Sequence, residues 1–95
     1  MAGKITVKFY GLMRRRLGTA VVEVAGDGLT IITLLRLAEE ETGQSFLDEL
    51  LDRKQGLLAG TIILINGENI RLRDGLQTKV VAGDSVALFS PAGGG

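Results

Sequence analysis

Residues 80–95 read VVAGDSVALFSPAGGG and carry the strongest structural signal in the chain. Residues 85–89 follow a turn signal at 82–84 and have the side-chain pattern of a β-strand. Pro91 fixes its own φ angle and biases Ser90 toward an extended backbone. The three glycines at 93–95 bring no side chain to a core and have the greatest backbone freedom. This pattern predicts a last strand that continues into a flexible tail, whose distinctive group is the α-carboxylate of Gly95.

The N-terminal part of the chain predicts two strands that pair with each other. Residues 4–10 and 20–25 each alternate side chains between two faces, as a strand packed on a core does. Gly11 and Gly18 bracket the connector between them, which carries three arginines at 14–16. We interpret this part as an antiparallel hairpin with a rather long tip.

The middle of the chain changes to a helical period. Its apolar residues recur at the spacing of one buried helix face: Ile31, Leu34, Leu35 and Ala38. Thr30 is suited to cap the start of this helix, and Gly43 is suited to end it. The apolar residues at 46–51 predict a second, shorter helical segment, which the glycines at 56 and 60 interrupt.

The remaining signals lie before the last strand. The apolar run at 61–65 predicts a buried strand, and Asn66-Gly67 predicts a tight turn because both residues tolerate positive φ. Ile70 and Leu72 then predict a short return strand. The order of elements predicts an α+β fold, with one main helix on one face of a mixed sheet of about five strands.

We expect the first and last strands, which are rich in apolar residues, to lie at the centre of the sheet. We expect one domain over residues 1–90 and a flexible tail over residues 91–95.

Composition excludes several classes of function. The chain has 95 residues, 45% of them hydrophobic and 23% charged, which suits a single globular domain. It contains no cysteine or histidine, which excludes disulfides, zinc–thiolate centres and a Ser-His-Asp triad. The formal net charge is +0, which argues against a nucleic-acid partner. No apolar segment is long enough to cross a membrane or act as a signal peptide, so we expect no membrane partner and a cytoplasmic protein.

The neutral total conceals an uneven distribution of charge. The first twenty residues carry two lysines and the arginines at 14–16 without any acid, whereas residues 21–52 are strongly acidic. Such a surface can steer a charged partner. The glutamates at 39–41 fall in the last turn of the predicted main helix, where the helix dipole disfavours anions.

The glycine tail has two interpretations. It is either a frayed end with no role or a segment that a partner binds. Ordering three glycines costs roughly 3–6 kcal/mol, so a bound tail needs additional contacts from the folded domain. Tyr10 and Phe89 are candidates for these contacts, because they lie close together if the first and last strands are neighbours. The alternation predicts that Tyr10 is exposed.

The predicted strand order, the sequence VVAGDSVALF at 80–89 and the ending FSPAGGG at 89–95 resemble the sulfur-carrier family. This family consists of ubiquitin-like β-grasp proteins and includes the small subunit of molybdopterin synthase (MoaD) and the thiamine sulfur carrier (ThiS). The FYG at 9–11, Arg14, the LG at 17–18 and the extra segment at 46–58 are similar to the molybdopterin branch. Two departures are Ser90 in place of the first proline of a pair, and Gly93, which extends the diglycine to three.

The resemblance implies a mechanism centred on Gly94 and Gly95. An E1-like adenylating enzyme would use ATP to adenylate the Gly95 carboxylate, and a sulfur donor would convert it to a thiocarboxylate. The tail would then enter the large subunit of molybdopterin synthase, in a heterotetramer of two small and two large subunits, and supply sulfur for the dithiolene. The resemblance further implies partner contacts at Tyr10, Ile70, Phe89, Pro91 and Gly93. The chain would be a co-substrate with no permanent cofactor, not a catalyst.

Other functions remain open at this stage. The same tail could join Gly95 to lysines of target proteins, as a ubiquitin-like modifier does. The sulfur could instead serve thiamine, cysteine, thiolated tRNA or a tungsten cofactor. A plain interaction module with an inert tail is the third reading.

Overall fold

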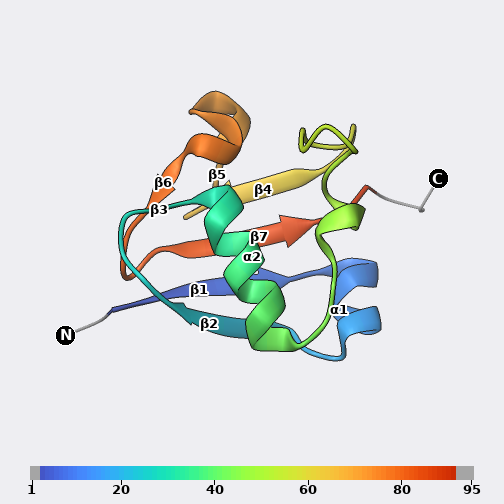
Figure 1. The fold of residues 1–95 in the computed structure, drawn as a ribbon, viewed down its shortest axis with the longest axis horizontal. Helices are drawn as coiled ribbons and strands as arrows, with labels where there is room; N and C mark the ends of the chain where they lie inside the picture. Colours follow the sequence, from blue (N-terminus) through green and yellow to red (C-terminus); the bar gives the residue numbers. More distant parts are fainter. Residues whose placement is uncertain (1–2, 92–95) are drawn as a thin grey trace.

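The computed structural model describes residues 3–91, which form a β-grasp fold around a mixed five-stranded sheet (Figure 1). The strand order is β2-β1-β7-β4-β5. Strands β1 and β7 are parallel neighbours, and the other adjacent pairs are antiparallel. The bounds are β1 Lys4–Phe9, β2 Val21–Ala25, β4 Ile62–Ile65, β5 Glu68–Asn69 and β7 Ser85–Phe89. The predicted central position of the first and last strands is therefore confirmed.

The main helix, α2 (Ile31–Thr42), crosses one face of this sheet (Figure 1). The Thr30 hydroxyl accepts a hydrogen bond from the Thr33 N–H, and Gly43 ends the helix with a φ of 69° and an N–H that donates to the Glu39 carbonyl. Both predicted caps are confirmed. Because glycine has no Cβ, it adopts this left-handed conformation without the steric penalty of other residues.

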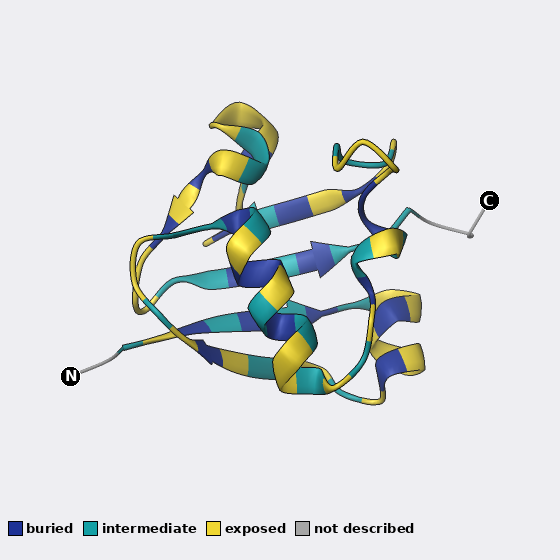
Figure 2. Ribbon diagram, in the orientation of Figure 1, coloured by how far each residue is buried: buried dark blue, intermediate teal, exposed yellow. Residues whose placement is uncertain are grey.

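The core lies between α2 and the sheet, where dark segments of both face each other (Figure 2). Phe9 and Phe46 meet there edge to face, with ring centroids 5.3 Å apart. The sheet contributes Ile5, Val7, Phe9, Ile63, Ile65, Val86 and Leu88, and α2 contributes Ile31, Leu34, Leu35 and Ala38. The helical periodicity thus identified the buried face of α2 correctly.

The connector after β1 differs from the prediction. The sequence indicated only a rather long hairpin tip, and the structure shows a short helix there, α1 (Gly11–Leu17). Met13 and Leu17, four residues apart, are buried on one side of it, while the three arginines are exposed. Only two of the seven residues are buried, which is too few to reveal a helical period in the sequence. Burial of these two side chains against the domain stabilises the helix instead.

The return strand is also shorter and earlier than predicted. Strand β5 covers Glu68–Asn69, and Ile70–Leu72 forms a 3₁₀ helix, η2. The Asn69 side chain accepts a hydrogen bond from the Arg71 N–H, which favours a helical turn over continued strand pairing. Two further elements were not predicted from the sequence. They are a second 3₁₀ helix, η3 (Gly75–Gln77), and a small sheet in which β3 (Leu29–Thr30) pairs with β6 (Lys79–Val80).

The predicted second helical segment at 46–51 is a single 3₁₀ turn, η1 (Leu47–Glu49). The chain then folds back in a loop that the Leu51–Leu57 bridge closes. We call residues 46–58 the insert segment. It lies near α1 and the end of β7, on the side of the molecule opposite to the N-terminus (Figure 1).

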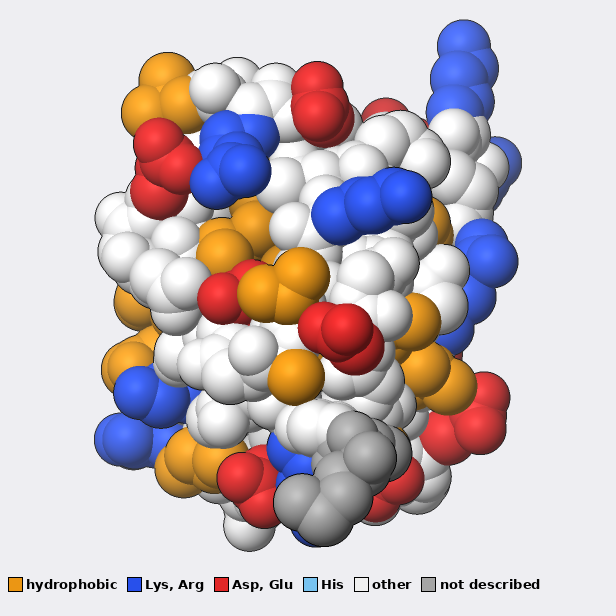
Figure 3. Space-filling view, turned by 90° about the vertical axis from the view of Figure 1, so that its left-hand side faces the viewer, with side chains coloured by type: hydrophobic (Ala, Val, Ile, Leu, Met, Phe, Trp, Pro, Cys, Tyr) orange, Lys and Arg blue, Asp and Glu red, His pale blue; other side chains and the backbone are white. Residues whose placement is uncertain are grey.

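The N-terminal end of the molecule shows a mixed surface. Basic, acidic and isolated hydrophobic side chains alternate there (Figure 3). A mixture of this kind is ordinary protein surface and does not single out a binding site.

Candidate functional site at the end of strand β7

The face of the sheet opposite α2 is open and mixed in character, with Lys4, Thr6 and Lys8 of β1 beside apolar side chains of β7 and β4. Along β7, Val86 and Leu88 are buried, whereas Ser85, Ala87 and Phe89 are half-buried and point to the other face. Nothing within residues 3–91 covers this second face as α2 covers the first. We call it the open face.

Tyr10 and Phe89 stack on each other where β1 and β7 end. Their ring centroids are 4.7 Å apart and the ring planes differ by 9°. The parallel pairing of Phe9 with Leu88 brings the two strand ends together and so places these rings side by side. The prediction that Tyr10 and Phe89 are close neighbours is confirmed, and Tyr10 is half-buried rather than fully exposed.

Two further apolar residues of the open face were missed in the sequence. Ile62 lies opposite Phe89 and Leu64 lies opposite Ala87 in the antiparallel pairing of β4 with β7. Ile62 is 41% exposed. The run at 61–65 predicts a buried strand because the residues on both faces of the strand are apolar. Such a run occurs in a strand covered on both faces, but here it reflects a strand with an apolar face left open.

A shallow hollow of about 340 Å³ lies on this face. Polar groups line one side of it, so the open face combines an apolar surface with hydrogen-bonding groups. The lining residues are Lys8, Tyr10, Leu64, Asn66, Gly67, Ser85, Ala87 and Phe89. This composition, with aromatic side chains and polar groups together, is typical of protein–protein interfaces.

The chain leaves the sheet through Ser90 and Pro91, both half-buried. Pro91 lies against Gly60, where an added Cβ would come within 3.3 Å of the Pro91 Cβ. Gly60 has a φ of 90°, a conformation that other residues rarely adopt. Gly60 therefore supplies both the room and the turn that let the chain pass at this point. The tail glycines Gly93, Gly94 and Gly95 lie outside the described residues.

Ile70 does not belong to this site. The resemblance implied a partner contact, but Ile70 is fully buried at the start of η2. Its side chain belongs to the hydrophobic core, so it stabilises the turn after β5 and is inaccessible to a partner in this structure.

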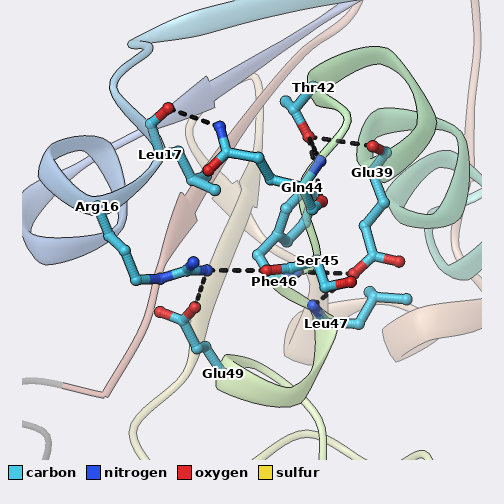
Figure 4. A network of polar contacts seen from close by, with 9 residues as sticks. All are labelled: Arg16, Leu17, Glu39, Thr42, Gln44, Ser45, Phe46, Leu47 and Glu49. Carbon is cyan, nitrogen blue, oxygen red and sulfur yellow. Dashed lines mark hydrogen bonds and ion pairs between the residues drawn. The ribbon is translucent and has the colours of Figure 1, made fainter.

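A polar network fixes the insert segment beside the site (Figure 4). The Glu39 carboxylate accepts hydrogen bonds from the Phe46 and Leu47 N–H groups at 2.7 and 2.9 Å. This contact explains an acid in the last turn of α2, where the helix dipole alone disfavours it. The carboxylate satisfies two backbone N–H donors at the start of η1 that have no partner within the helix.

The same network joins the insert segment to α1. Arg16 forms an ion pair with Glu49 and donates a hydrogen bond to the Ser45 carbonyl at 2.9 Å. Gln44 donates to the Leu17 carbonyl at 2.7 Å, at the end of α1 (Figure 4). These contacts hold α1 and η1 together as neighbours on the side of the molecule where β7 ends.

Two classes of site find no support in the described residues. No group of three or more carboxylates lies close enough to hold a metal ion within residues 3–91. In the same part of the chain, no helix has the length and apolar character needed to cross a membrane.

Comparison with known proteins identifies the family. The model of the ThiS family matches residues 7–95. A sulfur carrier protein of Archaeoglobus fulgidus, by its assigned name, is 34% identical over 74 residues, which are 78% of this chain and 83% of that protein. The chain belongs to the ThiS family. It is thus a small ubiquitin-like sulfur carrier, not a catalyst in itself, and members of this family work together with partner enzymes.

Two solved structures have the same fold. The small archaeal modifier protein 1 (SAMP1) of Methanosarcina acetivorans is 28% identical, with a TM-score of 0.70 over 100% of this chain and 99% of that chain. The molybdopterin converting factor subunit 1 of Pyrococcus furiosus is 19% identical, with a TM-score of 0.63 over 95% of this chain and 99% of that chain. The second likeness concerns the fold alone.

Proposed function

We propose that this sulfur carrier is the small subunit of a molybdopterin synthase and that the Gly95 carboxylate carries the sulfur as a thiocarboxylate. The observation that carries the proposal is the Tyr10–Phe89 stack at the end of β7, two residues before Pro91 and six before Gly95. A stacked aromatic pair gives a partner a rigid apolar contact beside the point where the chain leaves the sheet. The family match extends through residue 95, the last glycine.

The chemistry follows from the poor reactivity of a carboxylate. In the proposed first step, a Gly95 carboxylate oxygen attacks the α-phosphorus of ATP on an E1-like activating enzyme, and pyrophosphate leaves. In the second step, a sulfide equivalent from a sulfur donor attacks the acyl carbon and AMP leaves, which produces the thiocarboxylate. Gly94 and Gly93 have no side chain, so they can pass through a narrow channel to either active site.

The open face supplies the binding energy that the tail lacks. Ordering the tail glycines costs roughly 1–2 kcal/mol for each residue. At about 25 cal/mol per Å², burial of a few hundred Å² of apolar surface on the open face offsets this cost. In the proposed synthase, the open face docks on the large subunit and the thiocarboxylate reaches the molybdopterin precursor, where the sulfur enters the dithiolene.

The experiment that tests this proposal has two stages. The carrier is first incubated with its activating enzyme, ATP and a sulfur donor, and its intact mass is measured. We expect a gain equal to the difference between one sulfur and one oxygen atom, and no gain in a variant that lacks Gly94 and Gly95. The thiocarboxylated carrier is then mixed with a molybdopterin synthase large subunit and the precursor, and molybdopterin is measured. A carrier that gains no mass, or that supports no molybdopterin formation, contradicts the proposal.

A ubiquitin-like modifier is the second candidate function. The 28% identity to the Methanosarcina acetivorans SAMP1 over the whole chain favours it. In that case Gly95 forms an amide bond with lysines of target proteins. A tagged carrier expressed in its host would then give high-mass adducts that disappear when Gly94 and Gly95 are deleted. Absence of these adducts, together with a carrier that supports molybdopterin formation, would leave the synthase subunit as the function.

A further inference from the structure

A second hollow lies beside the point where the chain leaves the sheet, and it is separate from the open face. Its volume is about 270 Å³, and it is lined by Leu12, Glu49, Leu58, Ser90 and Pro91. We call it the exit groove. Leu12 is 53% exposed, so part of its side chain is accessible to a partner.

Chain length places any enzyme that acts on Gly95 near the exit groove. Gly95 is four residues after Pro91, so a fully extended chain spans at most about 14 Å between them. The reacting atoms of such an enzyme must therefore come within this distance of Pro91. The protein surface around its active-site opening then faces the residues that surround Pro91, which include the exit groove.

A basic side chain lies beside the exit groove. Glu49, the acid in the groove, is neutralised by its ion pair with Arg16 of α1. Arg15 lies three residues after Leu12 on α1 and so is adjacent to it on the helix surface. Arg14 and Arg15 are exposed, and within residues 3–91 neither forms an ion pair. The exit groove is thus a mainly apolar hollow with the basic side chain of Arg15 adjacent to it.

We propose that the exit groove binds the ATP-dependent activating enzyme, with an apolar side chain of that enzyme in contact with Leu12 and Leu58 and acidic side chains facing Arg15. This inference rests on the proposed activation of Gly95. A carrier must bind and leave its activating enzyme in every cycle, and complementary charge at a margin mainly accelerates association in such an encounter. The open face remains available for the apolar docking described above.

The test uses the full-length carrier and its activating enzyme and measures the rate of AMP release with a sulfur donor present. In Arg15→Glu and Leu12→Ser, we expect KM for the carrier to rise roughly tenfold with kcat unchanged, because both lose docking contacts and neither changes the reacting carboxylate. The KM of Arg15→Glu should also depend less steeply on salt concentration than that of the unchanged carrier.

Matched controls come from the opposite end of the molecule. Lys79 of β6 is exposed and forms no ion pair within the described part of the chain, and Leu72 of η2 is 78% exposed. Lys79→Glu and Leu72→Ser should leave KM within twofold of the unchanged carrier. Thermal unfolding of all four variants verifies that they are folded.

The outcomes separate this inference from the proposed function. If the unchanged carrier is activated but Arg15→Glu and Leu12→Ser behave like it, the exit groove is not the docking site and the proposed function stands. If Lys79→Glu raises KM as much as Arg15→Glu, the effect is one of net charge and the inference is wrong. If the unchanged carrier releases no AMP, the proposed function and the inference fail together.

Discussion

Strands β4 and β7 have apolar side chains on both faces of the sheet, but only one of these faces is covered. The covered face packs Ile63 and Leu88 against α2, and these side chains are almost completely buried. The open face presents Ile62 and Phe89 from the same two strands, and no helix within residues 3–91 covers them. The apolar character of a strand residue therefore does not show whether its side chain packs in the core or contacts a partner. The deciding factor is whether a second layer, such as a helix, covers that face of the sheet.

The largest expected effect is on the covered face. Leu34, fully buried on α2, is replaced by alanine. Loss of the side chain leaves a cavity in a packed core, so the free energy of unfolding should fall by about 2–5 kcal/mol. Urea denaturation followed by circular dichroism measures it. A loss below about 1 kcal/mol would mean that the helix and the sheet do not form a tightly packed interface.

The second effect concerns the network that holds the insert segment. In Glu39→Ala, the Phe46 and Leu47 N–H groups lose their carboxylate acceptor. The free energy of unfolding should fall by about 1–3 kcal/mol, as for other partly buried donors that lose a partner. Glu39→Gln is the matched control, since its amide oxygen can still accept and should retain part of the stability. Equal losses in both variants would show that charge, not hydrogen bonding, is the main contribution.

Sequence reasoning succeeded where a regular period or a local cap was present. The apolar spacing of residues 31–38, the Thr30 cap and the Gly43 stop gave α2 correctly, and the apolar first and last strands were placed at the centre of the sheet. It failed on α1, because Met13 and Leu17 are the only buried residues of a seven-residue helix that tertiary packing stabilises.

The candidate site was predictable only in part. Tyr10 and Phe89 were expected to be close only if the first and last strands were neighbours, and the parallel pairing of β1 with β7 meets that condition. Ile62 and Leu64 could not be assigned, because a run of apolar residues carries no sign of which face is covered. The role of Glu39 depends on residues 46 and 47, seven and eight positions away, and only the tertiary turn brings them together.

The third effect is on the aromatic stack. In Phe89→Ala, a half-buried ring and its contact with Tyr10 are lost. We expect a loss of about 1 kcal/mol in the free energy of unfolding, and a coupling of about 0.5–1.5 kcal/mol between Tyr10→Ala and Phe89→Ala in a double-mutant cycle. Partner binding should weaken far more than stability, because the ring is half-buried on the open face beside the point where the chain leaves the sheet. A coupling near zero would contradict a stacking contribution.

The smallest expected effect on stability is at Ile62. Its side chain is 41% exposed and lies opposite Phe89, so Ile62→Ser should change the free energy of unfolding by no more than about 0.5–1 kcal/mol. Its neighbour Ile63 points to the covered face and is 1% exposed, so Ile63→Ser should be strongly destabilising. The two residues adjoin in the sequence and differ only in the face of the sheet to which they point.

Binding of the large subunit, measured by calorimetry, should nevertheless weaken in Ile62→Ser, since the serine removes apolar area from the open face. If Ile62→Ser binds as the unchanged carrier does while Phe89→Ala does not, docking is confined to the aromatic pair and β4 contributes only to the fold.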